Sequence, residues 1–286
     1  MNRRTLVILA TGAVLATSAR MSPQGAGSGH KPAVSYSAPR LSDGTPDLRG
    51  IWQAQETAYI KIEGHPAEAG VRASASIVID PTDGKIPYLP DALKQRARNY
   101  ESRATTDPTN NCFQAGVPRA IFLPTPFQVF QSVGHLAIVY TDNHSYRMVL
   151  GSSVPHDDGI DFFMGDSRGR WEGDTLVVDV TDLGDQTWLD AAGNYHSDQL
   201  HVVEHYTLVG PDTMKYEATM TDPLVSARPW TVRLLLHRDK KPNARIVEDE
   251  CIDGPDGVWH HVSPFDRKAI LHHDYQAELD REGKSQ

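Results

Sequence analysis

The chain has 286 residues, and its 37 acidic and 28 basic side chains give a formal net charge of −9 at pH 7. The sequence shows no basic face of the kind that nucleic acid requires, so we expect no binding to nucleic acid. The two cysteines do not form a Cys-x-x-Cys pair, which argues against a thiolate metal centre.

The first residues, MNRRTLVILATGAVLATSA, are typical of a secretory signal peptide. Arg3 and Arg4 precede an apolar run over residues 5–17 that is too short to span a membrane. The alternative is an N-terminal anchor, but no stop-transfer pattern follows. We therefore predict a signal peptide over residues 1–19, a periplasmic or secreted protein, and no membrane insertion.

The rest of the chain divides by composition into three parts. Residues 20–46 are rich in Gly, Ser, Pro and Ala without periodicity, which predicts a flexible leader. Residues 47–252 have a globular composition and the length of one large β domain. Residues 253–286 are predicted to be a polar C-terminal tail, in which 266–282 has the weak apolar stripe of a short helix.

Short apolar stretches that alternate with polar residues predict strands, and the alternation is clearest from Met214 to Thr221. About ten strands with short turns indicate an antiparallel barrel or sandwich. A helix is expected from Asp91 to about Arg103, with Asp91 as a candidate cap. The expected strands are Gly50–Ala54, Ser76–Asp80, Phe127–Val133, His135–Tyr140, His144–Leu150, Leu176–Thr181, Leu200–Val209, Met214–Thr221, Trp230–His237 and Arg245–Cys251.

Cys112 and Cys251 are an even pair in a chain that we expect to be exported, which favours a disulfide. Such a bond would close a long loop and contribute ~4–5 kcal/mol in the chain-entropy model. The alternative is two buried free thiols.

Several blocks of the sequence resemble an uncharacterised family of secreted bacterial proteins. The blocks are PDLRGIW, IEGHPA, IPYLP, DPTNNCFQAGVPRA, PFQVFQ and DPLVSARPW, together with a long block that contains GDSRGRWEGDTLVVDVT. The resemblance covers nearly all of residues 46–251, and it implies secretion but no particular reaction. His205 departs from the Arg that is usual in the family, and the residues after Cys251 have no counterpart.

The tripeptide Gly50-Ile51-Trp52 is similar to the Gly-x-Trp start of lipocalin-type barrels. Together with the strand pattern, this similarity favours an antiparallel lipocalin-like β-barrel with a central cavity and one or two short helices.

The segment from His201 to His205 spells H-x-x-E-H, a zinc-protease signature that requires a helix. The segment is rich in β-branched residues and its neighbours alternate, so we predict a strand. On a strand both histidines share one face and Glu204 lies on the other, which argues against a zinc protease.

Glu204 shares its face with Leu200, Val202, Tyr206 and Leu208, so a carboxylate lies on an otherwise apolar face. If that face lines a cavity, the environment suits general acid–base chemistry. The alternative is a structural glutamate that an internal arginine holds, such as Arg147, Arg170 or Arg228.

Three histidines complete the candidate catalytic set. His144 shares a predicted strand face with Tyr146 and Met148, although a lone histidine on such a face is more often a core residue. His65 and His196 lie in predicted loops, where catalytic residues concentrate. These histidines offer ligands for a divalent metal, or they act without a cofactor. Candidate substrate-binding residues are Tyr88, Arg147 and Trp188.

Gly165-Asp166-Ser167 is similar to the nucleophile block of GDSL-type hydrolases, which place the serine between a strand and a helix. Here the context is β, so we interpret the charged residues from Asp166 to Asp174 as a rigid turn, with Trp171 closing one end of the barrel.

Two functions follow. The first is an exported enzyme that acts on a small, partly apolar organic molecule by His/Glu acid–base chemistry, as a lyase, hydratase or isomerase, with or without a metal. The second is a periplasmic lipocalin-like ligand-binding or carrier protein without catalysis. Convergence of His65, His144, His196 and Glu204 on one pocket would favour the enzyme. The oligomeric state stays open.

Overall fold

A computed structural model describes residues 36–67, 72–157, 159–247, 249–253 and 259–262 of the chain. The predicted signal peptide, the first part of the expected leader and the expected helix over residues 266–282 lie outside these ranges. Among the described helices, none combines the length and the apolar character that crossing a membrane requires.

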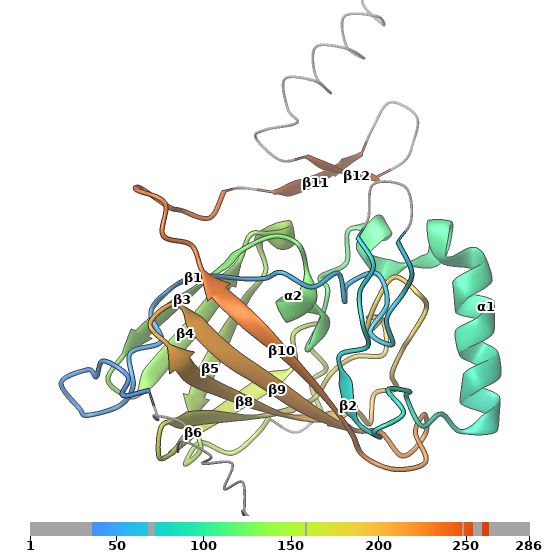
Figure 1. Ribbon diagram of the computed structural model, residues 1–286. Helices are drawn as coiled ribbons and strands as arrows, with labels where there is room; N and C mark the ends of the chain where they lie inside the picture. The colour runs from blue at the N-terminus through green and yellow to red at the C-terminus, as the bar shows by residue number, and fades with distance from the viewer. Residues whose placement is uncertain (1–35, 68–71, 158, 248, 254–258, 263–286) are drawn as a thin grey trace, which may run out of the picture. The chain divides into compact units, whose positions relative to one another are not determined.

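The described part is mostly β, with twelve strands and two α-helices (Figure 1). The helices are α1 (Pro90–Thr106) and α2 (Arg119–Phe122), and the short 3₁₀ segments are η1 (Pro108–Asn111) and η2 (Asp142–His144). The strands are β1 (Gly50–Ala54), β2 (Val78–Asp80), β3 (Phe127–Ser132), β4 (His135–Tyr140), β5 (Tyr146–Gly151), β6 (Asp166–Glu172), β7 (Thr175–Thr181), β8 (His201–Gly210), β9 (Thr213–Thr221), β10 (Trp230–Arg238), β11 (Glu250–Asp253) and β12 (Trp259–Val262).

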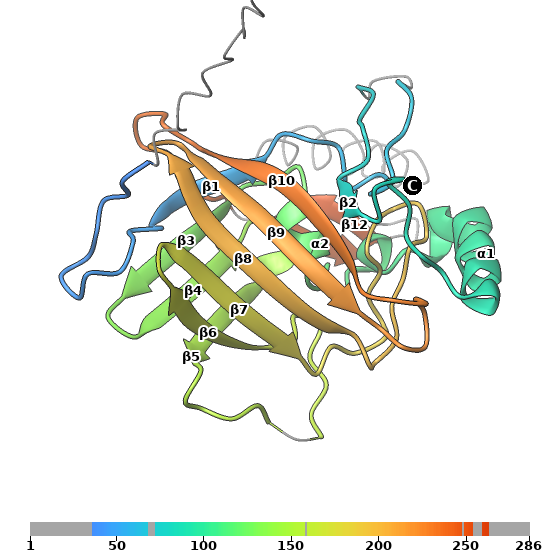
Figure 2. The same ribbon diagram turned by 60° about the horizontal axis from the view of Figure 1, so that its bottom comes forward.

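Nine of the described strands close into a barrel, which confirms the predicted fold class (Figure 2). The order around the barrel is β1-β3-β4-β5-β6-β7-β8-β9-β10, and β1 closes it by pairing with β10 as well as with β3. Closure places Trp52 opposite both Arg238 and Phe127, so the Gly-x-Trp strand is the seam of the barrel. β2 pairs with the first part of β10, outside the ring.

One pair breaks the expected antiparallel order, because β5 and β6 run parallel. Parallel neighbours require a connection that travels back along the barrel, and residues 152–165 provide it. β6 itself corrects the sequence interpretation, since Asp166 to Glu172 form a strand and not a charged turn. Its charged residues Arg168 and Arg170 alternate along the strand with Ser167, Gly169 and Trp171, and Trp171 packs against the core.

Large side chains fill the barrel interior, where a central cavity was expected. The alternation predicted for β9 is observed, and Met214, Tyr216 and Met220 have no exposed surface. Trp52 from β1 is also fully buried, and Phe122 from α2 lies edge-on to Tyr216 with 6.4 Å between ring centroids. Side chains without accessible surface leave no water-sized space beside them, so the centre of the barrel is a packed core.

The long connections reach the barrel at one end, which we call the long-loop end. β1 ends there and β3 begins there, as their register shows. The strand registers also place the start of β6, the start of β8 and the end of β7 at the long-loop end. The opposite end has short turns at residues 133–134, 173–174 and 211–212. Residues from distant parts of the sequence therefore meet at the long-loop end.

Helix α1 is close to its predicted range, but Asp91 does not cap it. Leu89 is the N-cap, Pro90 occupies the first turn, and Asp91 lies inside the helix as an acidic first-turn residue. Proline at this position is favourable because its missing N–H would have no helical partner.

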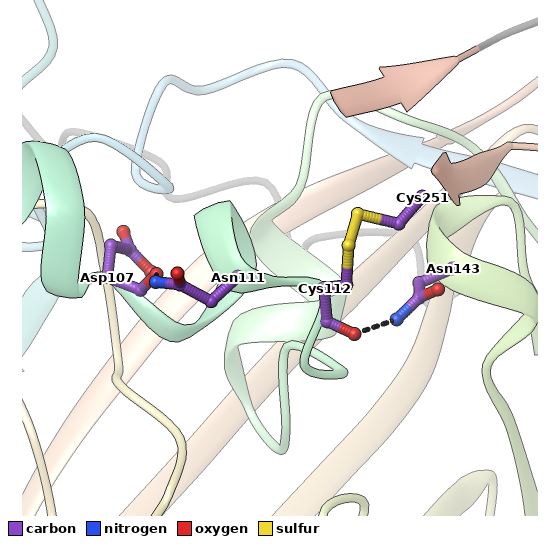
Figure 3. Close-up of a disulfide and its surroundings, with 5 residues drawn as sticks. All are labelled: Asp107, Asn111, Cys112, Asn143 and Cys251. Carbon is purple, nitrogen blue, oxygen red and sulfur yellow. Dashed lines mark hydrogen bonds between the residues drawn. A yellow bond between two sulfur atoms is a disulfide. The ribbon is translucent and has the colours of Figure 1, made fainter. Parts of the chain in front are cut away.

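The predicted disulfide between Cys112 and Cys251 is confirmed (Figure 3). It joins the end of η1 to β11, which pairs with β12 in a hairpin separate from the barrel sheet. The sequence placed a barrel strand over Arg245–Cys251 and a polar tail after it. In the structure the strand begins at Glu250 and its partner lies within the expected tail.

Residues 36–46 belonged to the expected leader, and the structure gives them a defined conformation. Arg40 pairs with Pro46 in an isolated bridge and forms an exposed ion pair with Asp174. Ala38 is buried in the core.

Candidate functional site

Glu204 lies inside the barrel, fully buried and paired. Arg147, from β5, contacts both of its carboxylate oxygens, with 3.2 Å between Nη1 and Oε1. The hydroxyls of Tyr206 and Tyr216 donate to Oε1 at 2.9 and 2.8 Å. Arg147 in turn donates from Nε to Ser167 Oγ at 2.8 Å. We call these five residues the interior network.

The electrostatics of this network favour a fixed ion pair. Burial opposes the charge on Arg147, but the adjacent carboxylate outweighs burial and raises the arginine pKa. Burial and the charge of Glu204 raise the pKa of Tyr206 and Tyr216. Burial also raises the pKa of nearby Tyr140 to about 12. Tyr206 and Tyr216 therefore stay protonated and donate hydrogen bonds to Glu204, which agrees with the alternative that Arg147 holds Glu204 for structure.

Ser167 belongs to the same network, so its surroundings differ from those of a hydrolase nucleophile. It lies on β6, is 1% exposed and accepts the hydrogen bond from Arg147. No histidine hydrogen-bonds to it among the described residues. The similarity to the GDSL block is therefore limited to the sequence and does not extend to the surroundings of the serine.

His196 is buried in the long connection between β7 and β8. Its Nδ1 lies 2.9 Å from the carbonyl oxygen of Ser197, which can only accept, so Nδ1 carries the proton. Nε2 therefore accepts from Thr187 Oγ1 at 2.6 Å. Burial lowers the pKa of His196, so the imidazole is neutral at pH 7.

His65 has an analogous pair of contacts in a more exposed loop. Nδ1 lies 2.8 Å from the carbonyl oxygen of Pro66, and Nε2 lies 2.7 Å from the hydroxyl of Thr57. His144 is exposed at the end of η2, with a left-handed φ of 51°. It precedes Tyr146, which is 64% exposed, so the face on which the sequence placed His144 points away from the barrel interior.

The remaining candidates lie near the segment that carries His196. The Tyr88 hydroxyl donates to Asn194 Oδ1 at 3.0 Å, and burial raises its pKa. Trp188 pairs in an isolated bridge with Tyr195, whose ring stacks on that of Tyr88.

The structure therefore brings two groups of predicted residues together and leaves others apart. Arg147 meets Glu204 in the interior, and Tyr88 and Trp188 lie near His196. Within the described residues, no hydrogen bond or ion pair joins any two of His65, His144, His196 and Glu204. Their convergence on one pocket stays a prediction.

A cleft of about 680 Å³ lies at the long-loop end, and we call it the mouth cleft. Its acidic lining residues are Asp107, Asp142 and Asp249, and its basic ones are Arg103 and Arg119. Apolar surface comes from the side chains of residues including Tyr59, Leu123 and Pro124.

The lining of the mouth cleft includes a buried ion pair between Asp107 and Arg119. Both nitrogens of the guanidinium fork lie 2.7 Å from the carboxylate oxygens, and both side chains are less than 5% exposed. Asp107 also caps η1 by accepting from the Thr109 N–H at 3.0 Å. Figure 3 shows Asp107 in the same region as the disulfide and Asn143, whose side chain donates to the carbonyl oxygen of Cys112.

Sequence reasoning missed this pair. Both residues belong to DPTNNCFQAGVPRA, which served only to support the resemblance. The signal that could have found them is Asp before Pro-Thr, a capping pattern, in a block that also contains a disulfide cysteine.

Sequence reasoning also missed a cluster of metal-ligating side chains. His156, Asp166 and Asp182 present ligand atoms that all lie within 4.8 Å of one another. The sequence pattern gives His156 no role, and it predicts Asp166 to lie in a turn. The predicted metal ligands His65, His144 and His196 do not belong to this group.

A comparison of the chain with models of known families, with curated proteins and with solved structures finds no significant match. The resemblance to the secreted bacterial family thus stays a prediction from the sequence blocks.

Proposed function

We propose that the protein is an exported binding protein that holds a small, partly apolar organic molecule in the mouth cleft. The observation that carries this proposal is the position of the cleft, because the barrel interior is filled while about 680 Å³ is open at the long-loop end. Small-molecule sites typically measure ~300–1,000 Å³ and occur at barrel mouths. The N-terminal sequence and the disulfide support export.

The lining indicates the class of ligand. Tyr59 and Leu123 offer apolar contact, and the Asp107–Arg119 pair is a preformed, charge-neutral part of the lining. Side chains that are rigid before binding lose little entropy when a ligand arrives. Three carboxylates and two guanidiniums line the cleft, so we expect a neutral or cationic ligand to bind better than an anionic one.

Binding explains the geometry better than acid–base catalysis does. Glu204 is sealed and fully paired, His65 and His196 have separate hydrogen-bond partners, and His144 is exposed. Proton transfer requires a base within hydrogen-bond reach of the substrate. The catalytic hypothesis stays a prediction, and the contacts of the described residues give it no common reaction centre.

A fluorescent probe tests the cleft. N-phenyl-1-naphthylamine is small, aromatic and neutral, and we expect saturable binding with increased fluorescence. Ala104→Trp adds an indole to an exposed position of α1 that lines the cleft, and it should weaken binding at least about tenfold by steric block.

The matched control is Leu93→Trp, which adds the same indole elsewhere on α1, at a side chain that is 53% exposed and outside the cleft lining. Met148→Ser controls for probe binding to the exposed apolar face of β5. Unchanged binding in Ala104→Trp, or loss of binding in Met148→Ser alone, would overturn the proposal.

A further inference from the structure

The cluster around His156 is formed by the parallel crossover. His156 belongs to the connection over residues 152–165, Asp166 is the first residue of β6, and Asp182 follows the last residue of β7. The three side chains are half-buried. They come together because β6 begins and β7 ends at the long-loop end.

Both ring nitrogens of His156 face carboxylate oxygens. Nδ1 lies 3.0 Å from Asp166 Oδ2, and Nε2 lies 3.3 Å from Asp179 Oδ1. A neutral imidazole carries one N–H, so it can donate to only one of these carboxylates. The lone pair of its other nitrogen then faces a carboxylate oxygen, which is repulsive unless a proton or a cation lies between them.

The charges around His156 also favour a bound cation. Asp166, Asp179 and Asp182 are three carboxylates, and Arg168 is the guanidinium that pairs with Asp166. With neutral imidazoles the cluster is net negative, which favours a cation.

The backbone holds the ligands in place. Asp182 has a left-handed φ of 55°, and its carbonyl oxygen accepts from the Phe162 N–H at 2.8 Å. The Thr181 hydroxyl donates to Asp182 Oδ2 at 2.8 Å. These contacts tie the crossover to the end of β7 and orient the carboxylate beside His156.

We propose that His156, Asp166 and Asp182 bind a divalent transition-metal ion of the Zn²⁺ class. Nδ1 of His156 is the nitrogen ligand, and Nε2–H donates to Asp179. Metal-binding histidines commonly donate their second N–H to a carboxylate in this way. His201 Nε2 lies 3.1 Å from the same Asp179 oxygen and holds that carboxylate in position.

The donor set favours Zn²⁺ over Ca²⁺, because Ca²⁺ takes six to eight oxygen ligands whereas imidazole suits Zn²⁺. Three protein ligands leave at least one coordination position for water or a ligand. The site is separate from the mouth cleft, and this inference does not depend on the proposed function.

The test must remove a competing source of histidine. The C-terminal region contains His260, His261, His272 and His273, so all four are changed to Gln in a background variant without an affinity tag. After EDTA treatment and dialysis, Zn²⁺ is titrated by calorimetry, and we expect one equivalent to bind. Ca²⁺ should bind at least about a hundredfold more weakly.

In that background, His156→Gln and Asp182→Asn should each weaken Zn²⁺ binding more than about tenfold, and Asp179→Asn by about 10–100-fold. The matched control is His205→Gln, a partly exposed histidine on β8 outside the cluster, which should bind as the background does. Circular dichroism in EDTA checks that each variant is folded.

A nitrogen-15 NMR spectrum of the background protein identifies the ligand atom without a variant at the site. Zinc should shift Nδ1 of His156 while Nε2 remains protonated. Absence of a bound equivalent, unchanged affinity in His156→Gln, or an unshifted His156 spectrum would overturn the proposal.

Discussion

Arg147 and Glu204 are 57 residues apart in sequence and form a salt bridge in the closed barrel, with both side chains at most 1% exposed. Neither is accessible to a ligand from outside. The pair therefore links β5 to β8 across the barrel interior.

Changing Glu204→Gln should destabilise the protein by about 3–5 kcal/mol, because it leaves the buried guanidinium without a counter-charge. Urea unfolding at pH 7 measures this loss. A glutamate that lined a cavity, as the strand pattern allows, would tolerate this change, whereas the buried contacts of Glu204 predict the opposite.

The double variant Arg147→Met with Glu204→Leu removes both charges and should recover part of the lost stability. Recovery should be incomplete because Ser167, Tyr206 and Tyr216 lose their partners. A double variant no more stable than Glu204→Gln would show that the salt bridge is not the main contribution.

His196 should make stability depend on pH. Its pKa is lowered in the folded protein, chiefly by burial, whereas the unfolded chain has the ordinary value of 6.5. Below that value the unfolded state binds the proton more readily, so stability falls as pH decreases from about 6.5.

The slope from this one group can approach about 1.4 kcal/mol per pH unit. His196→Gln lacks the titrating group, so its unfolding free energy should depend less on pH between 6.5 and 5. Parallel pH profiles for the two proteins would refute this assignment.

Removing the disulfide with Cys112→Ser and Cys251→Ser should cost less than the size of its loop suggests. A loop of 139 residues corresponds to about 5 kcal/mol in the chain-entropy model. In the folded protein, however, only residues 239–250 separate Cys251 from the end of β10.

Without the bond, the folded protein regains the entropy that was lost in closing this shorter loop, which is worth about 3 kcal/mol. The net loss of stability should therefore be roughly 2 kcal/mol. Hydrogen exchange should accelerate in β11 and β12 while the barrel strands remain protected. Uniform acceleration across the barrel would indicate instead that the hairpin and barrel unfold as one unit.

The backbone and the surroundings of Gly165, the first residue of the Gly-Asp-Ser block, require glycine. It has a φ of 65°, and an added Cβ would lie 2.6 Å from Val180 Cγ1 and 2.9 Å from Leu183 Cγ. Gly165→Ala should therefore cost more than 1 kcal/mol, and up to about 4 kcal/mol, from strain and overpacking.

The control is Gly134→Ala, which has a similar φ of 76° and no atom within 4 Å of the added Cβ. It should cost only about 1 kcal/mol, the conformational part. Thermal unfolding compares the two variants. Equal losses would mean that the space around Gly165 is not limiting.

The alternation of apolar and polar residues was enough to predict most of the barrel strands and the inward position of Glu204. This succeeded because a strand points successive side chains to opposite faces, which is a local property of the chain. The cysteine pair was also predictable, since two thiols in a chain that is predicted to be exported have few alternatives. β6 was missed because its outward charges resemble those of a turn.

The partners of buried side chains and the positions of cavities could be determined only from the closed barrel. Whether Glu204 faces a cavity or Arg147 depends on which strands become neighbours. The parallel β5–β6 pairing contributes to this order, and no periodicity in the sequence predicts it. The same pairing brings His156 to Asp166 and Asp182. The sequence by itself determined which side of each strand is apolar. Strand order and barrel closure decided which partners the inward side chains and those at the barrel ends contact. Order and closure depend on contacts between distant residues, so only the tertiary structure shows them.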